Sequence, residues 1–290
     1  MNAHNPFSIL FEDTDMLAIS KPAGVVVNEA VSAVGETVQE WARQYLASQP
    51  EQTKTSWLEM ITPDFDQQYG TPEEIFVQRA GMVHRLDKET SGVLLWAKNP
   101  GAQVELLRQF RERVVTKTYD SLVHGAVATA SGEITAPIDR SSYNRQRFAV
   151  AVDGRPAVTA YEVVARYTLD FDRFISAARQ AHLFAGRPAA QLKEHLTDYL
   201  DYTYLKCQPK TGRTHQIRVH CQHIGHPLVG DELYQGRKRI KLDEIWCQRH
   251  FLHAGSITFA HPRTQESLTL SAPLPADLLQ SLEWLHATSL

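Results

Sequence analysis

The order of the expected secondary-structure elements is the feature that most constrains this fold. Strand-like segments follow one another through the middle of the chain, and single helices interrupt them. A Rossmann fold or a β/α barrel requires a regular alternation of strands and helices, which this sequence lacks. The sequence therefore predicts an α+β sheet.

Local signals place several of these elements. Residues Ser8 to Asn28 predict two short strands joined by an acidic turn. Thr37 and Glu40 fit a capping box that opens a helix with an apolar face. Residues Gly81 to Lys98 predict a polar loop that feeds a buried strand, and Asn99 is a good N-cap for the next helix because Pro100 follows it. We expect that helix to present Leu106, Leu107, Phe110 and Val114 on one face.

The second half of the chain continues the mixed pattern. Lys117 to Gly125 alternates as a strand, with Tyr119 on one face, and further strands are expected up to Tyr167. The later expected elements are a strand at Tyr202 to Cys207, a helix at Thr214 to Ile224, strands at Phe251 to Phe259 and Ser267 to Leu270, and a closing helix at Ala276 to His286. Two segments do not fit the core pattern and are interpreted as insertions, Gln49 to Gln78 and Asp170 to Leu200, of which the second contains a short amphipathic helix.

Composition excludes several classes of protein. With 43% hydrophobic residues over 290 positions, the chain can bury a sizeable core, so it is not a disordered protein. Its apolar runs are strand-length, far below the roughly 20 residues of a membrane helix, and its start does not resemble a signal peptide. The three cysteines, Cys207, Cys221 and Cys247, form no CxxC pair, which is typical of a reducing compartment. We therefore expect a cytoplasmic protein.

Charge is distributed unevenly, although the net charge is only -3. Met1 to Gly70 holds three basic and ten acidic residues, whereas Lys206 to Lys241 holds eight basic and two acidic ones. This asymmetry predicts one basic surface, which could meet a nucleic acid despite the overall acidity.

Residue patterns alone leave the chemistry open. Five candidate metal ligands lie close together in the sequence (His215, His220, Cys221, His223 and His226), but their spacing does not match a known zinc motif. The sequence contains neither of the phosphate-binding loop motifs, G-x-G-x-x-G after a strand or G-x-x-x-x-G-K-[ST]. Ser91 does not lie in the G-x-S-x-G pattern that presents a nucleophilic serine. The patterns therefore favour satisfied or solvated histidines and predict neither a metal nor a nucleotide cofactor.

Asp87 is the more interesting candidate. It lies between Arg85 and Lys88, in a polar loop directly before an apolar strand, where a nearby cation such as Arg85 or Arg218 would keep a nucleophilic carboxylate ionised. Taken alone, the residue pattern favours Asp87 as a turn cap or a member of a surface ion pair over a catalytic role. Tyr119 is likewise consistent with a packed core aromatic, and Arg213 and Arg218 with solvated charges or phosphate contacts.

Five blocks of the sequence resemble the RluA-type pseudouridine synthase family, in that family's order. The central block is VHRLDKETSGVLLWAKN, Val83 to Asn99. The others are Ile9 to Val27, Lys117 to Gly125, Thr211 to Tyr234 (TGRTHQIRVHCQHIGHPLVGDELY) and Phe251 to Pro262. The blocks cover most of the chain outside the two insertions.

The resemblance implies an isomerisation of uridine to pseudouridine within RNA, with neither cofactor nor metal, on a mixed, mainly antiparallel sheet flanked by helices and loops. Asp87 matches the family's catalytic aspartate, Tyr119 its active-site tyrosine, and Arg218 the basic residue that pairs with the aspartate. Whether the carboxylate attacks the ribose or the base stays open. The resemblance also implies one catalytic domain over residues 1–290, without a separate N-terminal RNA-binding domain.

The implied partner is ribosomal or transfer RNA. Arg85 matches the position whose side chain fills the space that a flipped uridine leaves, and we expect His84, Arg213 and His215 to contribute to substrate binding, with His84 also a support of the loop. The basic residues Arg108, Arg111 and Arg113, and those of Lys206 to Lys241, are expected phosphate contacts. A monomer without membrane attachment is expected. Two alternatives remain: a non-catalytic RNA-binding or ribosome-assembly protein on the same fold, and a glycoside hydrolase with Glu89 as its second carboxylate.

Overall fold

The structure is a computed structural model, and it describes residues 6–29, 35–49, 56–61, 65, 68, 70–184 and 186–289. These residues form two compact units. Unit 1 comprises residues 1–117 and 254–273, and unit 2 comprises residues 118–253 and 274–290. The sheet strands of both units pair mainly antiparallel and carry flanking helices, which confirms the predicted α+β class.

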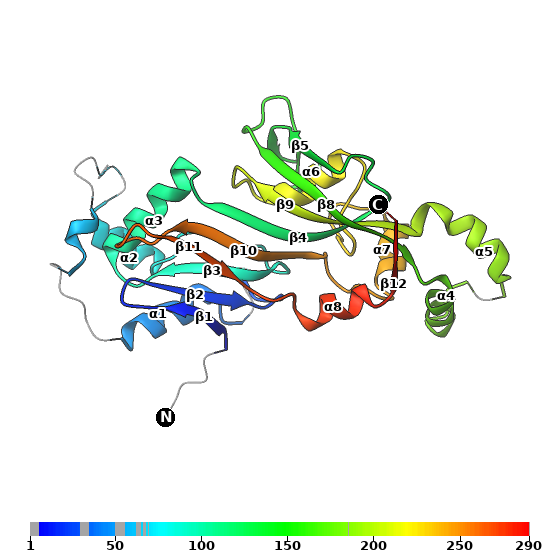
Figure 1. The fold of residues 1–290 in the computed structure, drawn as a ribbon, viewed down its shortest axis with the longest axis horizontal. Coiled ribbons are helices and arrows are strands. Elements are labelled where there is room, and N and C mark those ends of the chain that lie inside the picture. Colours follow the sequence, from blue (N-terminus) through cyan, green and yellow to red (C-terminus); the bar gives the residue numbers. More distant parts are fainter. Residues whose placement is uncertain are drawn as a thin grey trace. The chain divides into compact units, whose positions relative to one another are not determined.

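Unit 1 is built on strands in the order β1-β2-β3-β10, with β11 paired to β10. Figure 1 shows β1, β2 and β3 side by side. The strands are β1 (Ser8–Glu12), β2 (Met16–Lys21), β3 (Ser91–Ala97), β10 (Leu252–Ala260, within unit 1 from Ala254 onward) and β11 (Ser267–Ser271). The helices are α1 (Val38–Ala47), the short 3-10 helix η2 (Leu58–Met60), α2 (Pro72–Arg79) and α3 (Pro100–Glu112).

The core of unit 1 forms around β3, whose residues are all buried. Gly92 allows β10 to approach this strand, because a Cβ atom at Gly92 would lie 2.2 Å from the carbonyl oxygen of Ala254. Leu95, Leu106 of α3 and Phe259 of β10 belong to the same apolar cluster. The predicted caps are confirmed: Thr37 and Glu40 form the capping box of α1, and the Asn99 side chain accepts the backbone N–H of Ala102 at the start of α3.

Unit 2 is built on strands in the order β4-β9-β8-β12, with β5 paired to β8. The strands are β4 (Thr116–His124, within unit 2 from Thr118), β5 (Ser131–Thr135), β8 (Val158–Leu169), β9 (Asp201–Pro209) and β12 (Leu285–Thr288), and a separate hairpin consists of β6 (Ile138–Arg140) and β7 (Phe148–Val150). The helices are α4 (Phe171–Gln180), α5 (Ala189–Leu196), the 3-10 helix η4 (Thr197–Tyr199), α6 (Gln216–His223), α7 (Arg237–Asp243) and α8 (Ala276–Leu282).

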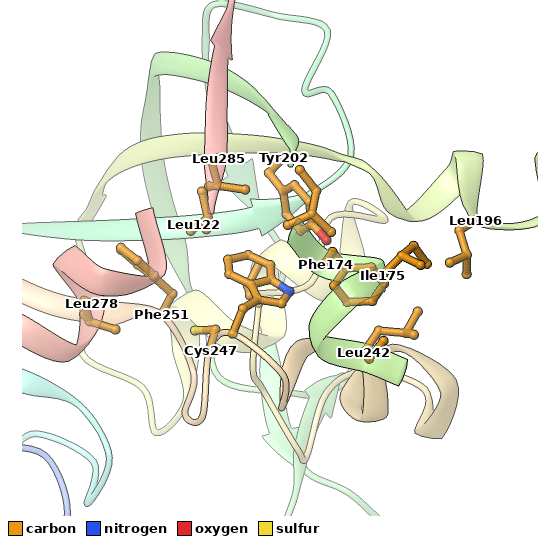
Figure 2. Packing of buried hydrophobic residues seen from close by; sticks show 14 of the residues in the cluster. Leu122, Phe174, Ile175, Leu196, Tyr202, Leu242, Cys247, Phe251, Leu278 and Leu285 are labelled. Atoms are coloured by element: carbon orange, nitrogen blue, oxygen red, sulfur yellow. The ribbon is translucent and has the colours of Figure 1, made fainter. Parts of the chain in front are cut away.

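The largest apolar cluster of unit 2 joins the second predicted insertion to the strands. Phe174 and Ile175 of α4 and Leu196 of α5 are buried in one cluster with Tyr202 of β9 and Leu242 of α7 (Figure 2). Burial of several large side chains supplies most of the free energy that holds such helices in place. The segment is therefore packed into unit 2, although Figure 1 shows α4 and α5 beyond one end of β8 and β9.

Several predicted boundaries are wrong. Val114 lies outside α3 and is 58% exposed, because the chain leaves the helix at Arg113 in a left-handed conformation. The predicted closing helix ends at Leu282, and the residues after it form β12, which pairs with β8. Helices α2, α4 and α7 were not predicted.

The first predicted insertion is only partly a surface loop. Residues 50–55, 62–64, 66–67 and 69 lie outside the described residues. Within the described part, Trp57 and Met60 are buried in the core of unit 1, and α2 begins at Pro72 behind a capping box of Thr71 and Glu74.

Candidate active site

The loop that carries Asp87 is fixed by a buried lysine. Lys21 is fully buried at the end of β2, and its Nζ donates to the carbonyl oxygens of Pro22 (2.8 Å), Val25 (3.0 Å) and Lys88 (3.0 Å). The Lys88 carbonyl also accepts the backbone N–H of Gly24 at 2.9 Å. The carbonyl of Lys88, next to Asp87, therefore accepts two hydrogen bonds, from Lys21 Nζ and from Gly24 N–H, which hold the loop against the Pro22–Val25 turn.

Asp87 itself is half-buried between buried and exposed neighbours. Its carbonyl accepts the backbone N–H of Thr90 at 3.1 Å, which closes a turn directly before β3. Leu86 is buried, whereas Arg85 and Lys88 are exposed. The buried side chain of Leu86 therefore holds the loop against the core, while Arg85, two residues before Asp87, is exposed to solvent.

His84 supports this loop from the other side. Its Nε2 accepts the backbone N–H of Leu95 in β3 at 2.9 Å, and its ring stacks on Phe110 of α3 at 4.9 Å between centroids. Burial, with a contribution from the positive charge of Lys117, lowers the pKa of His84 to about 3. His84 is therefore a neutral acceptor at ordinary pH.

In unit 2, Arg218 of α6 has a buried carboxylate partner. Its Nε donates to Oδ2 of Asp231 at 2.7 Å, and its Nη2 donates to Oδ1 at 2.8 Å. Asp231 is fully buried, and its Oδ1 also accepts the backbone N–H groups of Leu233 (3.0 Å) and Tyr234 (3.2 Å). This bidentate ion pair with Asp231 fixes the plane of the Arg218 guanidinium group.

Tyr119 lies on β4, where it pairs with Cys207 of β9. It is half-buried and packs against an apolar cluster that includes Ile217 and Cys221 of α6. The adjacent carboxylate, Asp120, accepts Tyr204 Oη at 2.6 Å and pairs with Lys206 at 2.6 Å. Because successive side chains of a strand point to opposite faces, the Tyr119 ring and the Asp120–Lys206 ion pair lie on opposite faces of β4.

Arg213 and His215 lie at the start of α6. Arg213 Nε donates to the Pro156 carbonyl at 3.2 Å, and Nδ1 of His215 is hydrogen-bonded to Tyr234 Oη at 2.8 Å. That hydroxyl also accepts the backbone N–H of Phe148 at 2.9 Å, so it links α6 to the β6–β7 hairpin. His215 adopts a left-handed conformation (φ 56°) at this junction.

Several of the predicted phosphate contacts have acidic partners. Arg108 pairs with Glu105 and Glu112, and Lys206 and Lys210 pair with Asp120 and Glu133. In contrast, α7 exposes the cations Arg237, Lys238 and Lys241, for which no ion pair occurs among the described residues. Lys238 and Arg239 lie over the ring of Tyr199.

Two of the histidines in and near α6 that were considered as metal ligands form hydrogen bonds within unit 2. His220 is hydrogen-bonded to Thr159 Oγ1 and to the Ala136 carbonyl, each at 2.9 Å, and Nδ1 of His226 to the His124 carbonyl at 2.8 Å. Hydrogen-bonded histidines are what the sequence favoured at these two positions.

A different group brings potential metal ligands together in unit 1. Ligand atoms of Asp13, Asp15 and His261 lie within 4.8 Å of one another. Asp15 already accepts Arg263 Nη2 and Nε at 2.6 and 2.7 Å and Asn99 Nδ2 at 2.9 Å, and Asp13 pairs with His261 at 2.6 Å. Burial raises the pKa of Asp15, but the hydrogen bonds from Arg263 and Asn99 outweigh it, so the pKa lies below its usual value. This arrangement is an ion-pair network between the β1–β2 turn and the end of β10.

The predicted site residues are divided between the units. Asp87, Arg85 and His84 belong to unit 1, whereas Tyr119, Arg213, His215 and Arg218 belong to unit 2. The predicted site residues did not include Lys21, Asp231 or Tyr234, although all three lie within the blocks that carry the family resemblance. The available signal was their polar character beside apolar residues, which indicates a buried polar group with a partner to be found.

Comparison with known proteins agrees with these blocks. A family model described as RNA pseudouridylate synthase matches residues 15–223. The uncharacterized RNA pseudouridine synthase YlyB of Bacillus subtilis is 34% identical over 95% of this chain and 71% of its own length. The ribosomal large subunit pseudouridine synthases D of Haemophilus influenzae and Pseudomonas aeruginosa are 33% and 34% identical, over 97% and 96% of this chain and 72% and 71% of theirs.

Solved structures agree on the fold. Human RNA pseudouridylate synthase domain containing 1 has a TM-score of 0.61 at 21% identity, covering 100% of this chain and 92% of that one. Human RNA pseudouridylate synthase domain containing 4 has a TM-score of 0.60 at 19% identity, covering 96% and 94%. Within the part of the chain that the structure describes, no helix is both long and apolar enough to cross a bilayer.

Proposed function

Because this chain belongs to the RNA pseudouridylate synthase family, we propose that it converts specific uridines of ribosomal RNA into pseudouridine, with Asp87 as the essential carboxylate. The chain is an RNA pseudouridine synthase, an isomerase that acts on uridine within RNA. The ribosomal substrate is inferred from relatives whose names specify the large ribosomal subunit. The match over residues 15–223 carries the proposal. Those relatives are bacterial, and we propose a cytoplasmic location.

The reaction is an exchange of bonds within one nucleoside. The bond between N1 of uracil and C1′ of the ribose breaks, the base turns, and a bond between C5 and C1′ forms. C5 loses its proton and N1 gains one, so the product has the formula of the substrate. We assign the bond-breaking step to the carboxylate of Asp87, whose loop is anchored by Lys21 and Leu86.

Tyr119 and Arg218 are the other proposed catalytic residues. Tyr119 offers an aromatic ring on a rigid strand, which suits stacking on an unstacked base. Arg218 provides a permanent positive charge whose orientation is fixed by Asp231. We propose Arg213 and His215, at the start of the same helix, as substrate contacts.

The target uridine must leave the base stack before it can react, which costs a few kcal/mol. Arg85 is exposed at the loop that carries Asp87, and we propose that its side chain fills the space left by the base. The exposed cations of α7 are proposed phosphate contacts, so binding should weaken steeply as salt is added.

The alternative of a non-catalytic RNA-binding protein is less favoured, because the relatives are named as synthases and Asp87, Tyr119 and Arg218 are all present. The glycoside hydrolase hypothesis requires a second catalytic carboxylate. Its candidate, Glu89, lies 3.8 Å from the ammonium group of its neighbour Lys88.

The test combines turnover in vitro with mapping in cells. Ribosomal RNA labelled with tritium at C5 of uridine, from cells that lack this gene, should release tritium with the wild-type enzyme and not with Asp87→Asn. Because Asp87→Asn keeps the shape of the side chain, we expect it to bind RNA with unchanged affinity. Glu89→Gln is the matched control and should retain full turnover.

In the same deletion strain, at least one pseudouridine of ribosomal RNA should be missing and should return only with the wild-type gene. Retained turnover by Asp87→Asn would refute the role of the carboxylate. A missing pseudouridine in transfer RNA alone would replace the proposed substrate.

A further inference from the structure

Three lysines of unit 1 are buried or partly buried, and they differ in their partners. Lys21 donates to three backbone carbonyls. Lys98 donates to Oε1 of Glu12 at 2.7 Å and to the Asp13 carbonyl at 2.6 Å. The third, Lys117, is partly buried at the start of β4, and its ammonium group forms neither a hydrogen bond nor an ion pair with any residue that the structure describes.

Lys117 lies beside the segment that leads to Asp87. Val115, two residues earlier, is buried in the same apolar cluster as Val83. In extended chain, side chains two positions apart point to the same side, so the Lys117 side chain follows that of Val115. Its positive charge also contributes to the lowered pKa of His84, an effect that weakens with distance. His84 precedes Asp87 by three residues, roughly 10 Å of extended chain at most.

An ammonium group in this position costs stability. It has lost part of its hydration without gaining a counter-ion from the protein, and burial accordingly lowers the pKa of Lys117 to about 8. An apolar side chain of the same length would fill the space without that cost. A cation that destabilises the fold this close to the proposed catalytic carboxylate indicates a role in binding.

A ligand can reach the ammonium group. Among the described residues, the polar atoms that are both closed to solvent and without a partner do not include the Lys117 nitrogen. The stem of the side chain is therefore enclosed while its charged end stays accessible. The partner that the protein does not supply is an anion. RNA carries one phosphate for each nucleotide, and the compact charge of a lysine ammonium is suited to phosphate oxygens.

We propose that Lys117 binds a phosphate of the substrate RNA that flanks the target uridine. The proposal rests on the proposed function, because it assumes an RNA substrate whose uridine reaches Asp87. The ion pair forms only in the complex, where the phosphate supplies the counter-ion that the free enzyme lacks. It holds the backbone of the target nucleotide while the base is out of the stack, and so contributes to the cost of unstacking.

Lys117→Met tests this contact, because it removes the charge and keeps an apolar stem of similar length. The probe is ribosomal RNA from the deletion strain, labelled with tritium at C5 of uridine. We expect Kd to rise about tenfold and the slope of log Kd against log salt to become shallower by about one. Turnover at saturating RNA should stay within about threefold of wild type. The urea midpoint at pH 7.5 should be unchanged or higher, because a charge without a partner is removed.

Lys98→Met is the matched control. Lys98 is also a partly buried lysine of unit 1, but its charge is already paired with Glu12. Its replacement should lower the urea midpoint and leave the RNA affinity and the salt slope of the folded enzyme unchanged. Lys117→Arg keeps the positive charge and should keep the salt slope of the wild type.

Chemical labelling gives a second measurement that needs no variant. Acetic anhydride acetylates lysines in their unprotonated form, so Lys117 should react at pH 7.5 ahead of lysines with an ordinary pKa. Peptide mass spectrometry measures the extent of the reaction. Saturating RNA should protect Lys117, and added salt should remove the protection. Equal labelling with and without RNA would contradict the contact.

Wild-type affinity and salt slope of Lys117→Met would overturn the proposal, and so would a lowered urea midpoint that accounts for all of its lost binding. A loss confined to turnover would also overturn the phosphate contact, and would assign the ammonium group to the uracil anion that forms when the bond between N1 and C1′ breaks. Absence of tritium release by the wild type would refute the proposed function itself. Normal release together with an unaffected Lys117→Met would refute only this inference.

Discussion

The two units of this protein fix their proposed catalytic residues by opposite means. In unit 1 a buried cation, Lys21, serves the backbone: its ammonium group binds three carbonyl oxygens, and one of them belongs to the residue after Asp87. In unit 2 a buried anion, Asp231, serves a side chain: its carboxylate binds two nitrogens of Arg218. Neither Lys21 nor Asp231 is a proposed substrate contact.

The difference reflects what each unit has to position. A short carboxylate such as Asp87 is placed by its backbone, so the loop must be held. The long side chain of Arg218 has several rotatable bonds, so its guanidinium group must be held directly. Lys21 buries one charge and the Asp231–Arg218 pair buries two, so both arrangements are sensitive to the loss of a partner.

The largest expected effect is that of Asp231→Ala. It removes the Asp231 carboxylate from the buried guanidinium group of Arg218, which should lower the free energy of unfolding by about 4 kcal/mol. Urea unfolding of the wild type and the variant measures this. Asp231→Leu combined with Arg218→Met should recover most of the lost stability while remaining inactive. If Asp231→Ala costs less than about 1 kcal/mol, the pair does not hold α6 as described.

Lys21→Met should have the next largest effect. It removes the three hydrogen bonds of the ammonium group, and we expect a loss of about 3 kcal/mol, less than for Asp231→Ala because the Lys88 carbonyl keeps the Gly24 N–H. Turnover should fall even under conditions where the variant is folded, because the Asp87 loop loses one of its two ties. The exposed Lys88→Met is the control for stability. A variant with wild-type turnover would contradict a positioning role for Lys21.

A smaller effect is expected from the ionisation of Lys117, a second lysine of unit 1 that is partly buried. Burial lowers the pKa of Lys117 to about 8, whereas an unfolded lysine titrates near 10.5. Between these pH values the unfolded chain binds more protons, so this group makes the free energy of unfolding rise with pH across that window, by about 2 kcal/mol.

The measurement is the difference in urea stability between the wild type and Lys117→Met from pH 7.5 to pH 9.5. The wild type should gain stability relative to the variant as pH increases. A constant difference would show that Lys117 keeps an ordinary pKa. The comparison is made below pH 10 because tyrosine ionisation adds its own pH dependence above that value.

Local sequence patterns predicted much of the fold. The caps of α1 and α3 are formed by the expected residues, Thr37, Glu40 and Asn99, because a cap is a contact between neighbours in the sequence. The buried strand β3 follows the polar loop as expected. The capping box of α2, Thr71 and Glu74, was also present but was overlooked within a polar segment.

Contacts between distant residues account for the wrong predictions. The apolar residues near the end of unit 2 continued a helical pattern, but β8 offers a strand edge there, and β12 pairs with it. Helix α4 is stabilised by burial against β9 and α7, which its own sequence does not reveal. The same holds for part of the candidate site: the partner of Arg218 is Asp231, which lies thirteen residues further along the chain.

The sequence by itself determined the class of fold, the principal caps and the set of residues that resemble a pseudouridine synthase. Only the tertiary structure decided how those residues are held: Asp87 by Lys21 through backbone carbonyls, and Arg218 by Asp231. It also placed the charge of Lys117 close to His84, thirty-three positions away in the sequence. The physical reason is that caps and periodicity involve neighbouring residues, whereas burial of a charge depends on every segment that packs around it.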